Sequence, residues 1–165
     1  MKTRTRMILN RTKTLLLLGS MLAVGSFARA QDTDRMIVAL TKVESNGNAA
    51  AVGDNGKAFG ILQIHISMVR DANRIASTTY THADMFNESK AIAVAKIVLK
   101  HYSKHILTTT GRPATLKELA FIWNGGGSAW KRASNPLDDS KQRNLETYWN
   151  KVAKALVATA QVQNL

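Results

Sequence analysis

Helical spacing of apolar residues, cut by short breaks rich in glycine and asparagine, most limits what this chain can fold into. Beyond residue 30, apolar side chains recur every three or four positions, and the whole chain has only two prolines. Such spacing predicts amphipathic helices that bury one face. We therefore expect a compact, mainly α fold in which the breaks mark the helix ends.

The segment boundaries follow from local signals. Thr115 with Glu118 forms a capping-box pattern at the start of one helix. Residues 50–62 contain Asn55-Gly56, a strong turn signal, which predicts a small β-hairpin. The predicted helices cover about residues 33–44, 67–76, 87–107, 115–123 and 144–160.

Residues 1–30 are typical of a secretory signal peptide. Basic residues come first, an apolar run follows, and Ala28-Arg29-Ala30 gives a small-x-small cleavage pattern. A membrane anchor is the alternative, but its helix needs ~20 predominantly apolar residues, and this run is shorter. We expect cleavage after Ala30, export to the periplasm or beyond, and one mature domain, residues 31–165, without a stable membrane span.

Net charge and residue composition limit which classes of molecule this protein is expected to bind. The first thirty residues hold six Lys or Arg and no acid, so they carry half of the formal +12 charge. A basic exported domain suits an anionic wall polymer, and the chain lacks the basic-aromatic platform expected of a nucleic-acid binder. Cysteine is absent, so stability must come from burial alone. His101 and His105 lack the flanking Glu of a zinc motif, and we expect no metal or other cofactor.

Two acidic residues are candidates for chemistry. Glu44 ends the first predicted helix on the side of Ile37 and Leu40, where burial would raise its pKa and suit a general acid. A surface Glu at a helix end is the plain alternative. Asp54 is the best second carboxylate, although its place beside Asn55-Gly56 is more typical of a turn.

Three other side chains could contact a sugar. Gln63 offers an amide to hydroxyl groups, or ends a strand facing water. Trp123 could stack on a sugar ring, or belong to the core. Asn124 precedes three glycines, which indicates a turn residue that tolerates left-handed backbone.

Four short motifs follow one another along the chain: Glu44-Ser45, Gly60-Ile61-Leu62-Gln63, Ile122-Trp123-Asn124 and Glu146-Thr147-Tyr148. In this order they resemble the soluble lytic transglycosylase (SLT) domain of the lysozyme-like superfamily, which has Glu-Ser, Gly-Leu-Met-Gln, Ala-Tyr-Asn and Glu-Thr…Tyr at these places. Trp123 stands where the family has Tyr, and Ile122 where it has Ala.

The resemblance implies an α+β lysozyme-like domain with its hairpin beside an active-site cleft. It also implies cleavage of the β-1,4 bond between N-acetylmuramic acid and N-acetylglucosamine, with a 1,6-anhydromuramyl product. Glu44 would be the sole catalytic acid and later the base. The implied substrate-binding residues are Ser45 and Gln63, which would orient Glu44 and substrate, Trp123 and Asn124, which would line the cleft, and Tyr148, which would approach Glu44.

Two alternatives remain open for the same fold. The Glu-Ser and Trp-Asn-Gly-Gly features also resemble invertebrate-type lysozymes, which implies a muramidase with Asp54 as second acid and water as acceptor. The second alternative is a non-catalytic module that binds the cell wall without cleaving it. In each case the expected partner is the glycan strand of peptidoglycan, and we expect a monomer.

Overall fold

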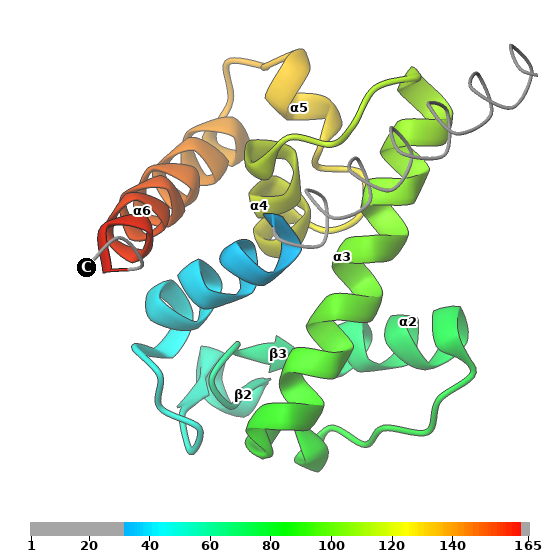
Figure 1. The fold of residues 1–165 in the computed structure, drawn as a ribbon, viewed down its shortest axis with the longest axis vertical. Helices are drawn as coiled ribbons and strands as arrows, with labels where there is room; N and C mark the ends of the chain where they lie inside the picture. The colour runs from blue at the N-terminus through cyan, green and yellow to red at the C-terminus, as the bar shows by residue number, and fades with distance from the viewer. Residues whose placement is uncertain (1–31, 163–165) are drawn as a thin grey trace, which may run out of the picture. The chain divides into compact units, whose positions relative to one another are not determined.

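Helices dominate the structure, a computed structural model that describes residues 32–162 (Figure 1). The chain divides into units 1–32 and 33–165, and only the second is described almost completely. The predicted signal peptide and its cleavage site lie outside the described residues. The mainly α prediction is confirmed: the helices cover residues 32–45, α2 Ile66–Ala76, α3 Glu88–Thr110, α4 Leu116–Gly125, α5 Lys131–Ser134 and α6 Ser140–Val162.

A small antiparallel sheet follows the first helix. Its strands are β1 Val52–Gly53, β2 Ala58–Phe59 and β3 Ile64–His65, in that order. The 3₁₀ turn η1, Asp54–Gly56, joins β1 to β2, with Asn55 and Gly56 at φ +53° and +83°. The predicted hairpin is confirmed, but β3 lies beyond residue 62 and was missed, because two residues are too few to show a period of two.

The helix ends show which local signals the chain uses. Asn87 accepts a hydrogen bond from the Lys90 amide at the start of α3, and Thr115 and Glu118 form the predicted capping box on α4. The loop predicted from residue 108 starts too early, because α3 continues to the left-handed Gly111. The short helix α5 was missed, and α6 begins at Ser140 rather than near residue 144.

One large core joins most of these elements, and a smaller cluster forms around Phe121, Ala129 and Leu145. Helix α3 packs against α2 and α4, while α4 also packs against α6. The first helix contributes Met36 and Leu40, and the sheet contributes Ile64, all fully buried. Gly60 brings the sheet against the 3₁₀ turn η2, Ala83–Phe86, since a Cβ there would lie 1.9 Å from the Met85 carbonyl oxygen. Within residues 32–162, no helix combines the length and apolar character required to span a bilayer.

Candidate active site

Glu44 lies in the last turn of the first helix, which stops where Asn46 and Gly47 adopt left-handed backbone, with φ of +55° and +85°. The side chain is half-buried, facing α4 and α6 rather than open solvent. The apolar stripe of this helix places it there, because Ile37 and Leu40 on the same face are in the core. The predicted face for Glu44 is therefore confirmed.

Two hydrogen-bond donors from distant parts of the chain meet on one oxygen of Glu44. The indole Nε1 of Trp123, in α4, donates to Oε1 at 3.0 Å, and the hydroxyl of Tyr148, in α6, donates to the same atom at 2.5 Å. Both rings are largely buried, with 7% and 9% of their surface exposed. Both of these hydrogen bonds go to Oε1, and the described part of the chain makes none to Oε2, so Oε2 is the oxygen that can hold the proton.

Burial decides the protonation of this group. Desolvation raises the pKa of Glu44, and it outweighs the hydrogen bonds from Tyr148 and Trp123 and the charge of Lys151, which all lower it. Burial, the nearby Glu44 charge and their hydrogen bond raise the pKa of Tyr148, so the phenol remains a donor. The site holds a carboxylic acid that stays protonated to higher pH than an exposed Glu, as the sequence predicts for a general acid.

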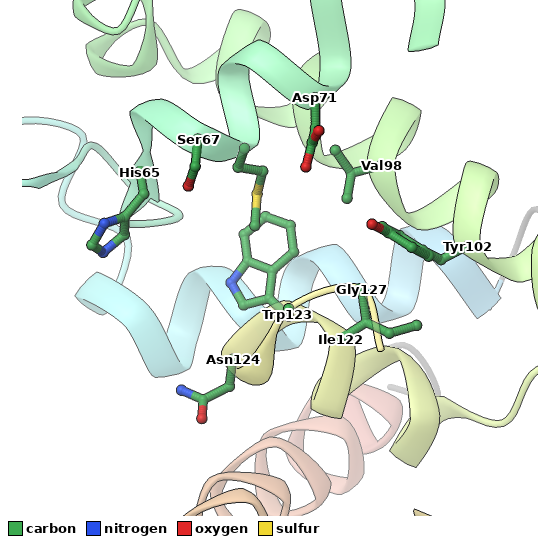
Figure 2. Close-up of a pocket in the computed structure, with 11 residues that line it drawn as sticks. His65, Ser67, Asp71, Val98, Tyr102, Ile122, Trp123, Asn124 and Gly127 are labelled. Carbon is green, nitrogen blue, oxygen red and sulfur yellow. The ribbon is translucent and has the colours of Figure 1, made fainter. Parts of the chain in front are cut away.

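A cavity of about 290 Å³ opens beside the Trp123 ring (Figure 2). Apolar and polar groups share its lining, a combination suited to a sugar ring, which has an apolar face and a hydroxylated edge. Helix α2, the end of β3, α3 and the end of α4 build its walls. The lining residues are His65, Ser67, Met68, Asp71, Val98, Tyr102, Ile122, Trp123, Asn124, Gly126 and Gly127.

One wall of this cavity depends on a glycine. The Tyr102 ring lies directly on Gly127, where an added Cβ would fall 2.1 Å from the tyrosine hydroxyl oxygen. Tyr102, His65 and Asp71 were not predicted from the sequence. The helical stripe through Val98 and Tyr102 was the signal available for Tyr102, but it indicated only a buried face.

Ser45 ties the end of the first helix to the turn before β3, and Gln63 bonds within the segment that carries the sheet. The Ser45 hydroxyl donates to the Ile61 carbonyl oxygen at 2.8 Å. The Gln63 side-chain nitrogen donates to the Gly60 carbonyl at 2.9 Å and to that of Ala51 at 3.3 Å. Gln63 itself adopts left-handed backbone, φ +46°, which a non-glycine residue tolerates only under strong local constraint. These contacts indicate a structural part for both residues, and substrate contact stays a prediction.

Asn124 lies at the cavity rim, where its exposed amide points away from the Trp123 ring (Figure 2). The interpretation of Asn124 as a left-handed turn residue is wrong, because it belongs to helix α4. The helix ends at Gly125, and Gly126 follows with φ +84° and ψ 173°, a backbone conformation that favours glycine.

Asp54 stands in the exposed turn η1 and contacts the cavity wall rather than the Glu44 cluster. Its carboxylate lies 3.3 Å from the Nε2 of His65, a residue that lines the cavity. The carboxylate is more than half exposed, and its own backbone has φ +47°. The structure therefore brings Glu44, Trp123 and Tyr148 together, and places Asp54 in the turn that its sequence neighbours predict. Among residues 32–162, no three His, Cys, Asp or Glu side chains gather as metal ligands would.

Comparison with known proteins agrees with this geometry. A family model described as the transglycosylase SLT domain matches residues 26–146, well over half of the chain, and this span includes Glu44, Gln63 and Trp123. It ends two residues before Tyr148. No curated protein matches the chain. At the level of the family, peptidoglycan cleavage of the lytic transglycosylase type follows from this match, and so does the lysozyme-like fold. The chain belongs to the transglycosylase SLT domain family.

Proposed function

We propose that this protein is a lytic transglycosylase that cuts the β-1,4 bond between N-acetylmuramic acid and N-acetylglucosamine. In the first step the Glu44 carboxylic acid donates its proton to the oxygen that bridges the two sugars. The bond from that oxygen to the muramyl C1 breaks, and N-acetylglucosamine leaves with its hydroxyl. The neighbouring acetamido group of the muramyl sugar stabilises the positive charge on C1.

The second step uses the same side chain as a base. Glu44, now a carboxylate, takes the proton from the muramyl 6-hydroxyl, and that oxygen bonds to C1 to close the 1,6-anhydro ring. The Tyr148 hydroxyl and the Trp123 indole N–H, both on Oε1, would stabilise the carboxylate between the two steps. Glu44 ends the cycle protonated, so no second acid and no water molecule is required.

The observation that carries this proposal is the single, half-buried acid with a raised pKa and two donors on one oxygen. A muramidase of the same bond would need a second carboxylate to activate water or attack C1. Asp54 is the available residue, and its exposed contact with the His65 ring favours a part in the turn. Asn124 would contact the glycan from the rim of the cavity, and Ser45 and Gln63 would orient Glu44 and the substrate.

The remaining features of the proposal concern where and on what the enzyme acts. Residues 1–30 would direct export, with cleavage after Ala30 and residues 31–165 as the mature domain in the periplasm or outside the cell. The substrate would be the glycan strands of peptidoglycan, bound without a metal or organic cofactor. The net positive charge of the described domain favours this anionic polymer.

Mass analysis of the fragments released from purified peptidoglycan tests the proposal. A transglycosylase leaves anhydromuramyl ends, which are lighter by one water than the reducing ends left by a muramidase. We expect anhydro ends, no cleavage by Glu44→Gln, and near-full activity of Asp54→Asn. Reducing ends that vanish in Asp54→Asn would establish the muramidase instead, and cleavage by Glu44→Gln at the wild-type rate would refute the role of Glu44.

A further inference from the structure

Lys151 lies one helical turn beyond Tyr148 on α6, so the two side chains share a face of that helix. The Tyr148 hydroxyl reaches Glu44 Oε1, which fixes this face of α6 toward the catalytic acid. The first helix and α6 also lie side by side farther along. A shallow groove there is lined by Val38, Thr41, Lys42, Asn46 and Gly47 from one side and by Ala155, Ala158 and Thr159 from the other.

The first helix and α6 lie alongside each other at this groove. Residues Val38 to Gly47 lie opposite Ala155 to Thr159, while Glu44 lies opposite Tyr148. Lys151 falls between Tyr148 and Ala155 in sequence, and its side chain is exposed. Lys151 therefore follows Tyr148 by one helical turn, with its side chain exposed, and lies close enough for its charge to act on Glu44.

Lys151 is the described cation whose charge acts on Glu44, and it is not held in a salt bridge as several other cations of the domain are. Lys117 pairs with Glu146 at 2.8 Å, Lys96 with Asp34 at 2.8 Å, and Arg132 with Asp139 at 2.9 Å. Within residues 32–162, Lys151 makes no salt bridge.

The charge of Lys151 also works against the acid it adjoins, since it lowers the pKa of Glu44. The other groups that face Glu44 are Tyr148, also on α6, and the uncharged Trp123 on α4. By lowering this pKa, Lys151 makes Glu44 lose its proton more easily in the free enzyme. The chemical steps proposed above give no reason for such a cation. A ligand carboxylate beside it would remove that effect.

We propose that Lys151 is a specificity-determining residue that pairs with a carboxylate carried by the muramyl side of the glycan. This inference rests on the proposed function. Two sources offer the same chemistry, namely the lactyl carboxylate of peptide-free muramic acid and the carboxylates of an attached stem peptide. When either group binds, it neutralises the ammonium, so the substrate itself helps Glu44 to keep its proton until cleavage.

Binding measured without turnover tests this pairing. The Glu44→Gln protein would be titrated calorimetrically with three muramyl-glucosaminyl oligosaccharides that have a free lactyl carboxylate, an amidated lactyl group, or a peptide stem. We expect Lys151→Met to weaken binding of at least one anionic ligand about two- to fivefold, the range of an exposed ion pair, and the loss to shrink at high salt. The ligand that loses affinity identifies the source of the carboxylate.

Matched variants separate charge from structure in the same experiment. Lys151→Arg should retain the affinity, the amidated ligand should not distinguish Lys151→Met from its parent, and Lys104→Met, an exposed lysine on α3, should bind every ligand as the parent does. Unchanged affinity of Lys151→Met for both anionic ligands would overturn the inference, as would an equal loss for the amidated ligand. Neither result depends on whether the enzyme makes anhydro or reducing ends, so the proposed function is tested separately.

A second readout uses the otherwise wild-type enzyme. Because Lys151 lowers the pKa of Glu44, Lys151→Met should move the high-pH limit of kcat/KM upward, while Lys104→Met leaves it in place. A limit that stays fixed or moves downward in Lys151→Met would contradict the electrostatic part of the inference.

Discussion

Replacing Tyr148 with Phe removes one hydroxyl and keeps the buried ring, so it isolates the hydrogen bond to Glu44. That bond is 2.5 Å long, and it stabilises Glu44 most when the side chain is a carboxylate, between proton donation and proton recovery. A hydrogen bond to a charged group contributes about 1.5–3 kcal/mol. Since about 1.4 kcal/mol corresponds to tenfold in rate, kcat should fall about tenfold to a hundredfold.

The same variant should change the pH dependence in a definite direction. The Tyr148 hydrogen bond lowers the pKa of Glu44, so its loss leaves burial less opposed and raises that pKa further. Activity that requires protonated Glu44 is lost as pH rises through this pKa. The high-pH limit of kcat/KM should therefore move upward in Tyr148→Phe, even though the maximal rate is lower.

The assay is the initial rate of anhydromuropeptide release from soluble glycan, measured across pH. Tyr80→Phe is the matched control, because Tyr80 lies in the loop after α2, where its backbone bonds to Asn73. It should keep both kcat and the pH limit. If Tyr148→Phe retains kcat within about twofold, or if its pH limit moves downward, then Tyr148 does not act on Glu44 as the structure indicates.

Two further predictions concern stability. Glu44 has a folded-state pKa above its usual 4.5, so the stability that it contributes is complete below that pH and is lost as pH rises through the folded-state pKa. Glu44→Gln, which cannot ionise, should therefore melt at a higher temperature than wild type near ~pH 8 and at a similar temperature near ~pH 4, and equal melting at both pH values would contradict the burial of this acid. Gly60→Ala should lower the free energy of unfolding by about 2–4 kcal/mol. The left-handed backbone at residue 60 is unfavourable for alanine, and the added methyl group would clash with the Met85 carbonyl oxygen. Gly47→Ala meets only the backbone strain, since nothing lies within 4 Å of its Cβ, and urea unfolding that gives equal losses for both variants would refute the close approach at Gly60.

Local chemistry made the helices predictable. Thr115 and Glu118 satisfy each other's backbone groups within four residues, so the start of α4 can be read from sequence alone. The position of Glu44 follows equally from the stripe that holds Ile37 and Leu40. The short elements were harder to predict from the sequence. Strand β3 has two residues and helix α5 four, too few for any periodic signal.

The surroundings of Glu44 could not be read from sequence spacing. Trp123 and Tyr148 lie 79 and 104 positions away, and only the fold brings them to one oxygen atom. The sequence offered Trp123 as either a core residue or a sugar platform. In the structure Trp123 is buried, lines the cavity and donates a hydrogen bond to Glu44. It is therefore both a core residue and a site residue, two interpretations that the sequence presented as alternatives. The family resemblance supplied the approach of Tyr148, which the apolar pattern of the last helix did not.

The pKa of the Glu44 carboxyl group, measured by NMR of its side-chain carbon in the purified protein, tests the account most directly. We predict a value above the usual 4.5 of a glutamate, which rises further in Tyr148→Phe. A Glu44 that titrates at or below 4.5, or that does not respond to Tyr148→Phe, would contradict the claim that a buried, protonated acid drives glycan cleavage.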